Sequence, residues 1–391
     1  MKNQIIKYLD KYNFDIRVSK DARFMDQKVT PDVLCIVADC IINYIDNTSN
    51  KEFTSSGIWK YDYSNENVMD IFGKTNVNNP KAKNEYNKFF QQPLKALSYA
   101  KILNERKVGN TIYFSIENYK ILEYISYKEK HSLEFLNIYL EKVLKDSEIW
   151  YMFDKFFNDN TKDNFDILKS KYENFIIRNT PKNGKTEVRR IFTKIINPLS
   201  FMRKKHATKK GRFSKDIISR DKLMYNRKNW RDLSKKKAET REEFEMRIGM
   251  EKNKQNAYVK YTLNKAKNII KKLHFPESEI QDEFSVGDAR DIHHIFMKSQ
   301  YPEISTYIEN LILLTPTQHF TKAHPNDTNI INKYYKLLCL LAKSDSIEKY
   351  NYIYSKEDFL YVLKIGLKQN FSNNIEFGEL KTKLVELYNI A

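Results

Sequence analysis

Cysteine, glycine and long apolar runs are all scarce in this sequence. The 391 residues include three cysteines, Cys35, Cys40 and Cys339, and none forms a Cys-x-x-Cys pair. This count excludes a disulfide framework and a four-cysteine zinc site, and it favours a reducing compartment. There are 9 glycines, well below the usual frequency of about 7%. Neither Gly-Lys-Thr triplet has the upstream glycine of a phosphate-binding loop, so a nucleotide-hydrolysing site is not expected.

No apolar run is long enough to cross a membrane. The most apolar early run, residues 33–42, is interrupted by Asp39 and falls far short of the roughly 18–20 residues that a span requires. The first residues lack the apolar core of a secretion signal. Aromatic residues make up 14% of the chain, which argues against disorder. We therefore expect a folded cytoplasmic protein that has no membrane partner.

Positive charge is abundant and unevenly distributed. Lys and Arg number 68 against 50 Asp and Glu, and residues 181–240 alone hold 20 basic and 5 acidic residues. Such a field favours polyanions, above all nucleic acid. Five aromatic residues interrupt this stretch, which favours a folded DNA-binding region over the alternative of a solvated basic arm. The basic side chains expected to contact DNA are Arg203, Lys204, Lys209, Lys210, Arg212, Arg220, Arg227, Lys228 and Arg231.

Hydrophobic periodicity predicts a mostly helical α+β protein. Thr30 and Pro31 are expected to open a helix, and Pro93 is expected to start another. Residues 102–116 read as two strands that turn at Gly109-Asn110. Helices followed by a hairpin favour a winged-helix-like DNA-binding module over residues 1–120, with a generic small α+β domain as the alternative. Residues 121–285 are expected to form a helical, basic and aromatic region for DNA recognition.

Four of the seven histidines fall within 32 residues, namely His293, His294, His319 and His324. The segment reads as a strand ending in His-His, a polar loop, a second strand and a helix that starts at Pro316. Hydrolysis of a phosphodiester needs a base that works near neutral pH, for which imidazole is suited. A bound cation can stabilise the charge that develops on the phosphate. Adjacent residues of a strand point to opposite sides, so two neighbouring histidines can divide these two tasks.

This arrangement resembles the HNH, or ββα-metal, nuclease motif over residues 287–326: His-His-Ile, a variable loop, Asn-Leu-Ile, a short turn and two further histidines. The resemblance implies that His294 is the general base and that His293 and His319 bind a divalent ion. It also implies that Asn310 holds the loop that positions the base. The ion expected is Mg²⁺, with Mn²⁺, Zn²⁺ and Ni²⁺ as alternatives that an imidazole-rich site also suits.

The sequence departs from the family pattern in two places. The last histidine of the family often follows the helix histidine at four residues, whereas His324 follows at five, as a candidate third ligand. Thr315 and Gln318 stand where many members have zinc-binding cysteines, so we expect this part to be held by packing alone. Two further side chains are candidates: Asp291 could orient a ligand imidazole, and Lys298 could contact a phosphate.

A motif of about 40 residues leaves most of the chain for selecting a target. With the expected DNA-binding regions, this favours a sequence-specific type II restriction endonuclease that cleaves double-stranded DNA, with the catalytic domain and C-terminal helices over residues 286–391. A single motif cuts one strand, so a homodimer is expected at a symmetric site. A companion DNA methyltransferase is also implied. The alternatives are a homing or mobile-element HNH endonuclease, a DNA-binding regulator with an inert motif, and cleavage of RNA.

Overall fold

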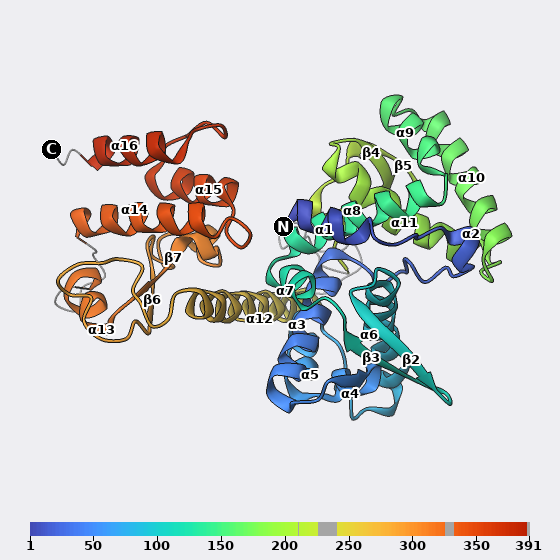
Figure 1. The fold of residues 1–391 in the computed structure, drawn as a ribbon, viewed down its shortest axis with the longest axis horizontal. Helices are drawn as coiled ribbons and strands as arrows, with labels where there is room; N and C mark the ends of the chain where they lie inside the picture. The colour runs from blue at the N-terminus through green and yellow to red at the C-terminus, as the bar shows by residue number, and fades with distance from the viewer. Residues whose placement is uncertain (210, 226–240, 325–331, 389–391) are drawn as a thin grey trace. The chain divides into compact units, whose positions relative to one another are not determined.

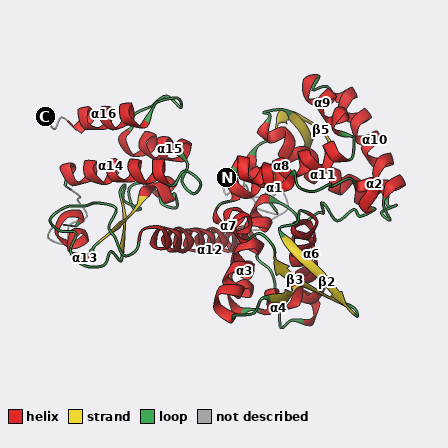
Figure 2. Cartoon of the chain, viewed as in Figure 1, coloured by secondary structure: helices red, strands yellow, loops and turns green. Residues whose placement is uncertain are grey.

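The computed structural model describes the chain except for residues 210, 226–240, 325–331 and 389–391, and it leaves the side chains of residues 81 and 241–252 undescribed. The described part is mostly helical with a few short strands (Figure 2), which confirms the expected α+β class. It forms two compact units, Met1–Gln255 and Asn256–Ala391. This division does not coincide with the boundaries expected after residues 120 and 285. None of the described helices combines the length and apolar composition of a membrane span.

The first unit contains most of the described elements. They are α1 (Lys2–Leu9), α2 (Ile16–Ser19), α3 (Pro31–Thr48), β1 (Glu52–Thr54), α4 (Ser55–Lys60), α5 (Asp62–Phe72), η1 (Pro80–Ala82), α6 (Lys83–Tyr99), β2 (Leu103–Val108), β3 (Thr111–Ile116), α7 (Tyr119–Tyr127), α8 (Glu129–Asp146), α9 (Trp150–Asn158), α10 (Lys162–Asn179), α11 (Lys185–Met202), β4 (His206–Lys209), β5 (Arg212–Ile217) and η2 (Arg220–Lys222). Helix α12 (Arg241–His274) begins in this unit and ends in the second.

The N-terminal part of this unit combines α3 and α6 with a three-stranded antiparallel sheet of order β1-β3-β2 (Figure 1). The expected helix begins at Pro31, directly after Thr30, and its periodic apolar residues are buried. Strands β2 and β3 pair from Leu103 opposite Ile116 to the turn. Gly109 has φ of 57° there, a conformation that glycine adopts at little cost. The predicted helix and hairpin are thus confirmed.

The prediction that Pro93 starts a helix was wrong. Helix α6 begins ten residues earlier, at Lys83, and contains Pro93 in its interior. An interior proline removes one backbone hydrogen bond and costs about 3 kcal/mol. Burial of the apolar face of α6, which includes Phe89, Phe90 and Leu94, offsets this cost because each such side chain contributes about 1.5–3 kcal/mol. Packing therefore decides where this helix begins.

The basic stretch contains a hairpin as well as helix. Strands β4 and β5 pair antiparallel around Gly211, which has φ of 77°. The side chain of Asn197 on α11 is buried against β4, with hydrogen bonds to both the N–H and the carbonyl of Thr208. Phe213 on β5 packs against Phe156 and Phe165. Phe192 on α11 also packs against Phe165. These two aromatic residues of the stretch therefore share one aromatic cluster, which helps to explain why the region folds despite its charge.

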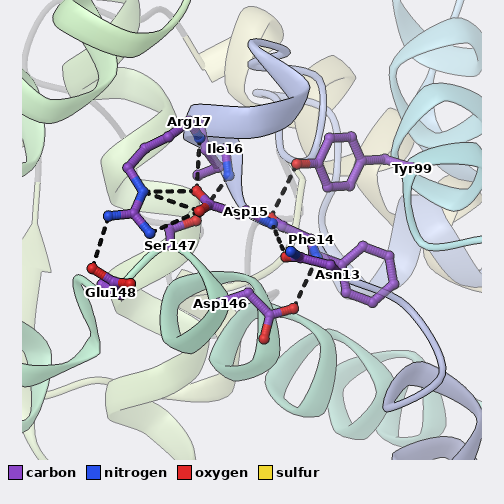
Figure 3. Close-up of polar contacts among 9 residues, drawn as sticks. All are labelled: Asn13, Phe14, Asp15, Ile16, Arg17, Tyr99, Asp146, Ser147 and Glu148. Carbon is purple, nitrogen blue, oxygen red and sulfur yellow. Dashed lines mark hydrogen bonds and ion pairs between the residues drawn. The ribbon is translucent and has the colours of Figure 1, made fainter.

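Figure 3 shows how the segment before α2 is tied to the end of α8. Phe14 N donates to Asp146 Oδ2 at 2.8 Å, and Ile16 N donates to Ser147 Oγ at 3.0 Å. Arg17 bridges the carboxylates of Asp15 and Glu148. Apart from the local pair of Arg17 with Asp15, these contacts join residues that are more than 130 positions apart in the sequence. The N-terminal segment and the helices after residue 120 therefore belong to one unit.

The second unit holds the histidine segment and a set of helices. Its elements are β6 (Asp291–His294), η4 (Pro302–Ile304), η5 (Ile308–Asn310), β7 (Leu311–Leu314), α13 (Pro316–Gln318), η6 (His319–Ala323), α14 (Lys333–Lys349), α15 (Lys356–Leu367) and α16 (Phe377–Tyr388). A buried ion pair joins Lys343 of α14 to Glu279 at 2.6 Å, both side chains being 0% exposed. Glu279 Oε1 also accepts a hydrogen bond from Leu313 N at 2.9 Å. Glu279 therefore fixes β7 against α14.

Candidate functional site

The two-stranded hairpin of β6 and β7 carries the first pair of histidines. His293 lies opposite Ile312 and His294 opposite Leu311. All four residues of β7 are buried, so this apolar strand anchors the hairpin in the core. Because successive residues of a strand point to opposite sides, the two imidazoles have different surroundings. His293 is 3% exposed, whereas His294 is half-buried.

Three histidines that are separate in the sequence converge. His293, His319 and His324 each offer one ring nitrogen, and these nitrogens lie within 4.8 Å of one another. Within the described part of the chain, Nε2 of His293 is buried and has no hydrogen-bond partner. Burial, with the neighbouring imidazoles, lowers the pKa of His293 to about 3. Burial also lowers the pKa of His319, against the opposing effect of Asp291. Neutral imidazoles keep the lone pairs that bind a metal ion, so the donor set fits a divalent cation.

The backbone accounts for the unusual spacing of His324. Residues His319–Ala323 form a π-helical turn, η6, in which His324 N donates to His319 O at 2.9 Å. A π turn connects residues five apart, whereas an α turn connects residues four apart. The extra residue before His324 is therefore accommodated within the turn. His324 reaches the same cluster as His319, as the interpretation of a third ligand requires.

His294 and Asn310 are linked through the loop between the strands. His294 Nε2 lies 3.1 Å from the carbonyl oxygen of Ser305. A carbonyl only accepts, so Nε2 carries the proton and Nδ1 retains a lone pair. Asn310 is fully buried, donates to the carbonyls of Phe296 and Ile304, and accepts from Phe296 N. It thereby joins Phe296, two residues after His294, to Ile304, the neighbour of Ser305, which places Asn310 where it can position His294.

The two further candidates also lie at this site. Asp291 Oδ2 is 3.3 Å from Nδ1 of His319, so the imidazole that Asp291 can orient is that of His319. Lys298 is exposed and lines an open pocket of about 630 Å³. The same pocket is lined by all four histidines of the segment. A phosphate that entered this pocket would meet Lys298 and the imidazoles together.

The basic residues expected to bind DNA differ in their surroundings. Arg203 is paired with Glu141 and lies over the rings of Trp150 and Phe157. Arg220 is paired with the buried Glu129. These two arginines are therefore engaged within the protein. The residues whose side chains are exposed and form no ion pair with other described residues are Lys204, Lys209 and Arg212, whereas Arg220 is exposed as well as paired. The residues that lie outside the described part of the chain are Lys210, Arg227, Lys228 and Arg231.

Two features of the site were missed by sequence reasoning. The carbonyl of Ser305 belongs to the turn between η4 and η5, and a backbone acceptor carries no side-chain signal. The second feature is a buried hydrogen-bond network around Thr315 and Gln318, which contradicts the expectation that packing alone holds this part. Its signal was present, because Thr-x-x-Gln before a helix is the pattern of a capping box.

Known proteins provide no template for this site. No family model, curated protein or solved structure matches the chain. The geometry around β6, β7 and η6 therefore carries the functional argument.

Proposed function

We propose that this chain is a metal-dependent DNA endonuclease with an HNH-type active site, and that it acts as a type II restriction enzyme. One observation carries the proposal: three imidazole nitrogens converge within 4.8 Å, and the adjacent His294 keeps a lone pair on Nδ1 because Nε2 donates to a carbonyl. A cation site and a separate base on neighbouring residues are what hydrolysis of a phosphodiester requires.

The roles of the side chains follow from their positions. His293, His319 and His324 would hold a divalent ion, which supplies positive charge to the scissile phosphate when bound. His294 Nδ1 accepts the proton of the attacking water. The Ser305 carbonyl, which accepts from Nε2, then stabilises the imidazolium. Lys298 is the phosphate contact. We propose Mg²⁺ for turnover, with Mn²⁺, Zn²⁺ and Ni²⁺ as ions that the imidazole donors also accept.

Two parts of the first unit support DNA as the substrate. At the end of the β4–β5 hairpin, the exposed side chains of Lys209 and Arg212 lie directly opposite each other. We call these two residues the hairpin pair. Like charges in such a pair repel each other, and a phosphate backbone would relieve the repulsion. The element order α3-β1-α4-α5-α6-β2-β3 also supports a winged-helix-like module, as the sequence analysis predicts.

Assembly and biological setting belong to the same proposal. One cluster with one base addresses one phosphodiester, so two copies related by a two-fold axis would cut both strands of a symmetric site. We propose a cytoplasmic homodimer paired with a methyltransferase that protects the same site. Mixing wild-type protein with excess His294→Ala tests the dimer. Mixed dimers should accumulate nicked circles, whereas independent monomers would continue to linear product.

The catalytic role of His294 is tested with supercoiled plasmid and Mg²⁺ or Mn²⁺. His294→Ala should lower the cleavage rate by about 10²–10⁴-fold, the contribution typical of a general base, while DNA affinity is retained. The control is His274→Gln, which removes an imidazole from the same unit at a position that bonds Tyr354, and which should keep near wild-type cleavage. Wild-type rates in His294→Ala would exclude this residue as the base. DNA binding without any cleavage by the wild type would favour the regulator.

A further inference from the structure

A fully buried amide lies directly before His319. Gln318 is 0% exposed. Its Oε1 accepts from Thr315 N at 3.0 Å and from Ser278 Oγ at 2.6 Å, and its Nε2 donates to Ile280 O and to Asp282 Oδ1, each at 2.9 Å. A side-chain amide has two donor hydrogens and two acceptor lone pairs. All four donors and acceptors of Gln318 are engaged within the protein, and none is left to form a hydrogen bond with water.

The amide connects two stretches that are separate in the sequence. One is the turn formed by α13 and η6, which carries His319 and His324. The other is the irregular segment of residues 278–284. Thr315 adds a second connection, because its Oγ1 donates to Phe284 O at 2.9 Å and accepts from Gln318 N at 3.2 Å. Thr315 and Gln318 therefore hold the same segment from the first turn of the helix, in a capping box.

Burial of this amide carries an energetic risk, so we expect the network to have a structural role. Burial of an unpaired amide is unfavourable, and each buried partner left without a hydrogen bond is destabilising as well. An apolar core at this position would avoid that risk. The network instead fixes an orientation, because its four hydrogen bonds hold the backbone at Gln318 in one position. The next residue along the chain is His319, whose imidazole must face the cluster.

We infer that Gln318 is a positioning residue, which ties residues 278–284 to the α13–η6 turn and thereby sets the geometry of the His293, His319 and His324 cluster. The inference that the cluster holds an ion rests on the proposed function, whereas the bracing of the turn does not. The network performs with hydrogen bonds the cross-linking that cysteines and a structural zinc ion would perform at these positions.

The test compares two network variants with a control in the same unit. Gln318→Met keeps the approximate shape and removes all four side-chain hydrogen bonds. Ser278→Ala removes one of these four hydrogen bonds, and it provides the test if Gln318→Met does not fold. Ser355→Ala is the control, because it removes the side-chain cap of α15, which bonds Asp358 N, and its stability loss is typically about 1 kcal/mol. The readouts are hydrogen exchange of residues 316–324 in metal-free protein, and Co²⁺ affinity and visible absorption.

We expect Gln318→Met to speed exchange across residues 316–324 and to weaken Co²⁺ binding by about 10- to 100-fold, as mutations of residues that orient metal ligands do. Ser278→Ala should show a smaller effect of the same kind, and Ser355→Ala should change neither readout. Wild-type Co²⁺ affinity and exchange in both network variants would overturn the inference. If wild-type protein binds no Co²⁺, the proposed function fails, and the exchange data alone then decide the inference: unchanged exchange overturns it and faster exchange supports it.

Discussion

Replacing Asn310 with alanine should loosen the loop between β6 and β7 while removing no group that we expect to touch DNA or metal. Asn310 is 0% exposed and makes three side-chain hydrogen bonds, at 2.8, 2.9 and 3.2 Å. They hold Phe296, two residues after His294, and Ile304, the neighbour of the Ser305 whose carbonyl accepts from His294. The substitution therefore tests whether the position of the base depends on this one amide.

The expected loss follows from the number of bonds. A buried intramolecular hydrogen bond contributes a net of about 1 kcal/mol, so three of them amount to about 3 kcal/mol. Because 1.4 kcal/mol corresponds to a factor of ten, the loop should open roughly 100-fold more often. Asn197 provides a matched control, since it is also buried and its side chain makes two bonds to the backbone of Thr208, both at 3.1 Å. Asn197→Ala should cost about 2 kcal/mol by the same argument.

Urea unfolding and hydrogen exchange measure these effects. Asn310→Ala should accelerate exchange in residues 295–305 and should lower the cleavage rate without a matching loss of DNA affinity. Asn197→Ala should leave exchange in residues 295–305 at the wild-type rate, because Asn197 belongs to the other unit. An Asn310→Ala protein with a stability within about 0.5 kcal/mol of wild type, the range of ordinary surface substitutions, would refute this reasoning.

Three further predictions concern packing, pH and salt. A Cβ on Gly366 would overlap the ring of Phe296, so Gly366→Ala should cost about 1–3 kcal/mol in urea unfolding through overpacking, and an unchanged midpoint would contradict that contact. Burial alone would raise the pKa of Glu279, but Lys343 and its other partners hold it below the usual value. The stabilisation from Glu279 is therefore present above the unfolded pKa of about 4.3 and is lost as pH falls through the folded pKa. In acid unfolding, the free energy of unfolding of Glu279→Gln should consequently decrease less steeply over this pH range than that of wild type. Neutralising both members of the hairpin pair should reduce the slope of log K against log salt for duplex DNA by about 1.8, at roughly 0.9 for each phosphate contact; an unchanged slope would show that the pair is only solvated.

Sequence reasoning succeeded where local signals and tertiary packing agree. The helix from Pro31 and the hairpin at Gly109 are confirmed, because each has a residue whose own chemistry starts or turns the chain. It failed at Pro93, where burial of an apolar face outweighs the local cost of proline. It also missed the β4–β5 hairpin, whose strands are rich in charge and poor in β-branched residues, although Gly211 marks the turn.

The candidate site shows the same division. The spacing of His293, His294 and Asn310 indicated which residues would lie at the hairpin. The structure places the two histidines on β6 and Asn310 at the end of η5, directly before β7. The sequence offered His324 as a candidate third ligand, but it could not show that His324 reaches the cluster, because this depends on a π turn that adds one residue to the helical repeat. The acceptor for His294 is a backbone carbonyl, and such a group has no counterpart in the pattern of side chains. Catalysis by these residues stays a prediction.

Cleavage of a plasmid of known sequence, with and without a chelator, tests the central claim most directly. Wild-type protein with Mg²⁺ or Mn²⁺ should produce fragments whose sequenced ends all fall at fixed positions relative to one short, recurrent, symmetric site, and chelation of the ion should abolish the fragments. Intact plasmid at every ion concentration, ends scattered at random, or cutting that continues in excess chelator would contradict the account of a metal-dependent, sequence-specific endonuclease.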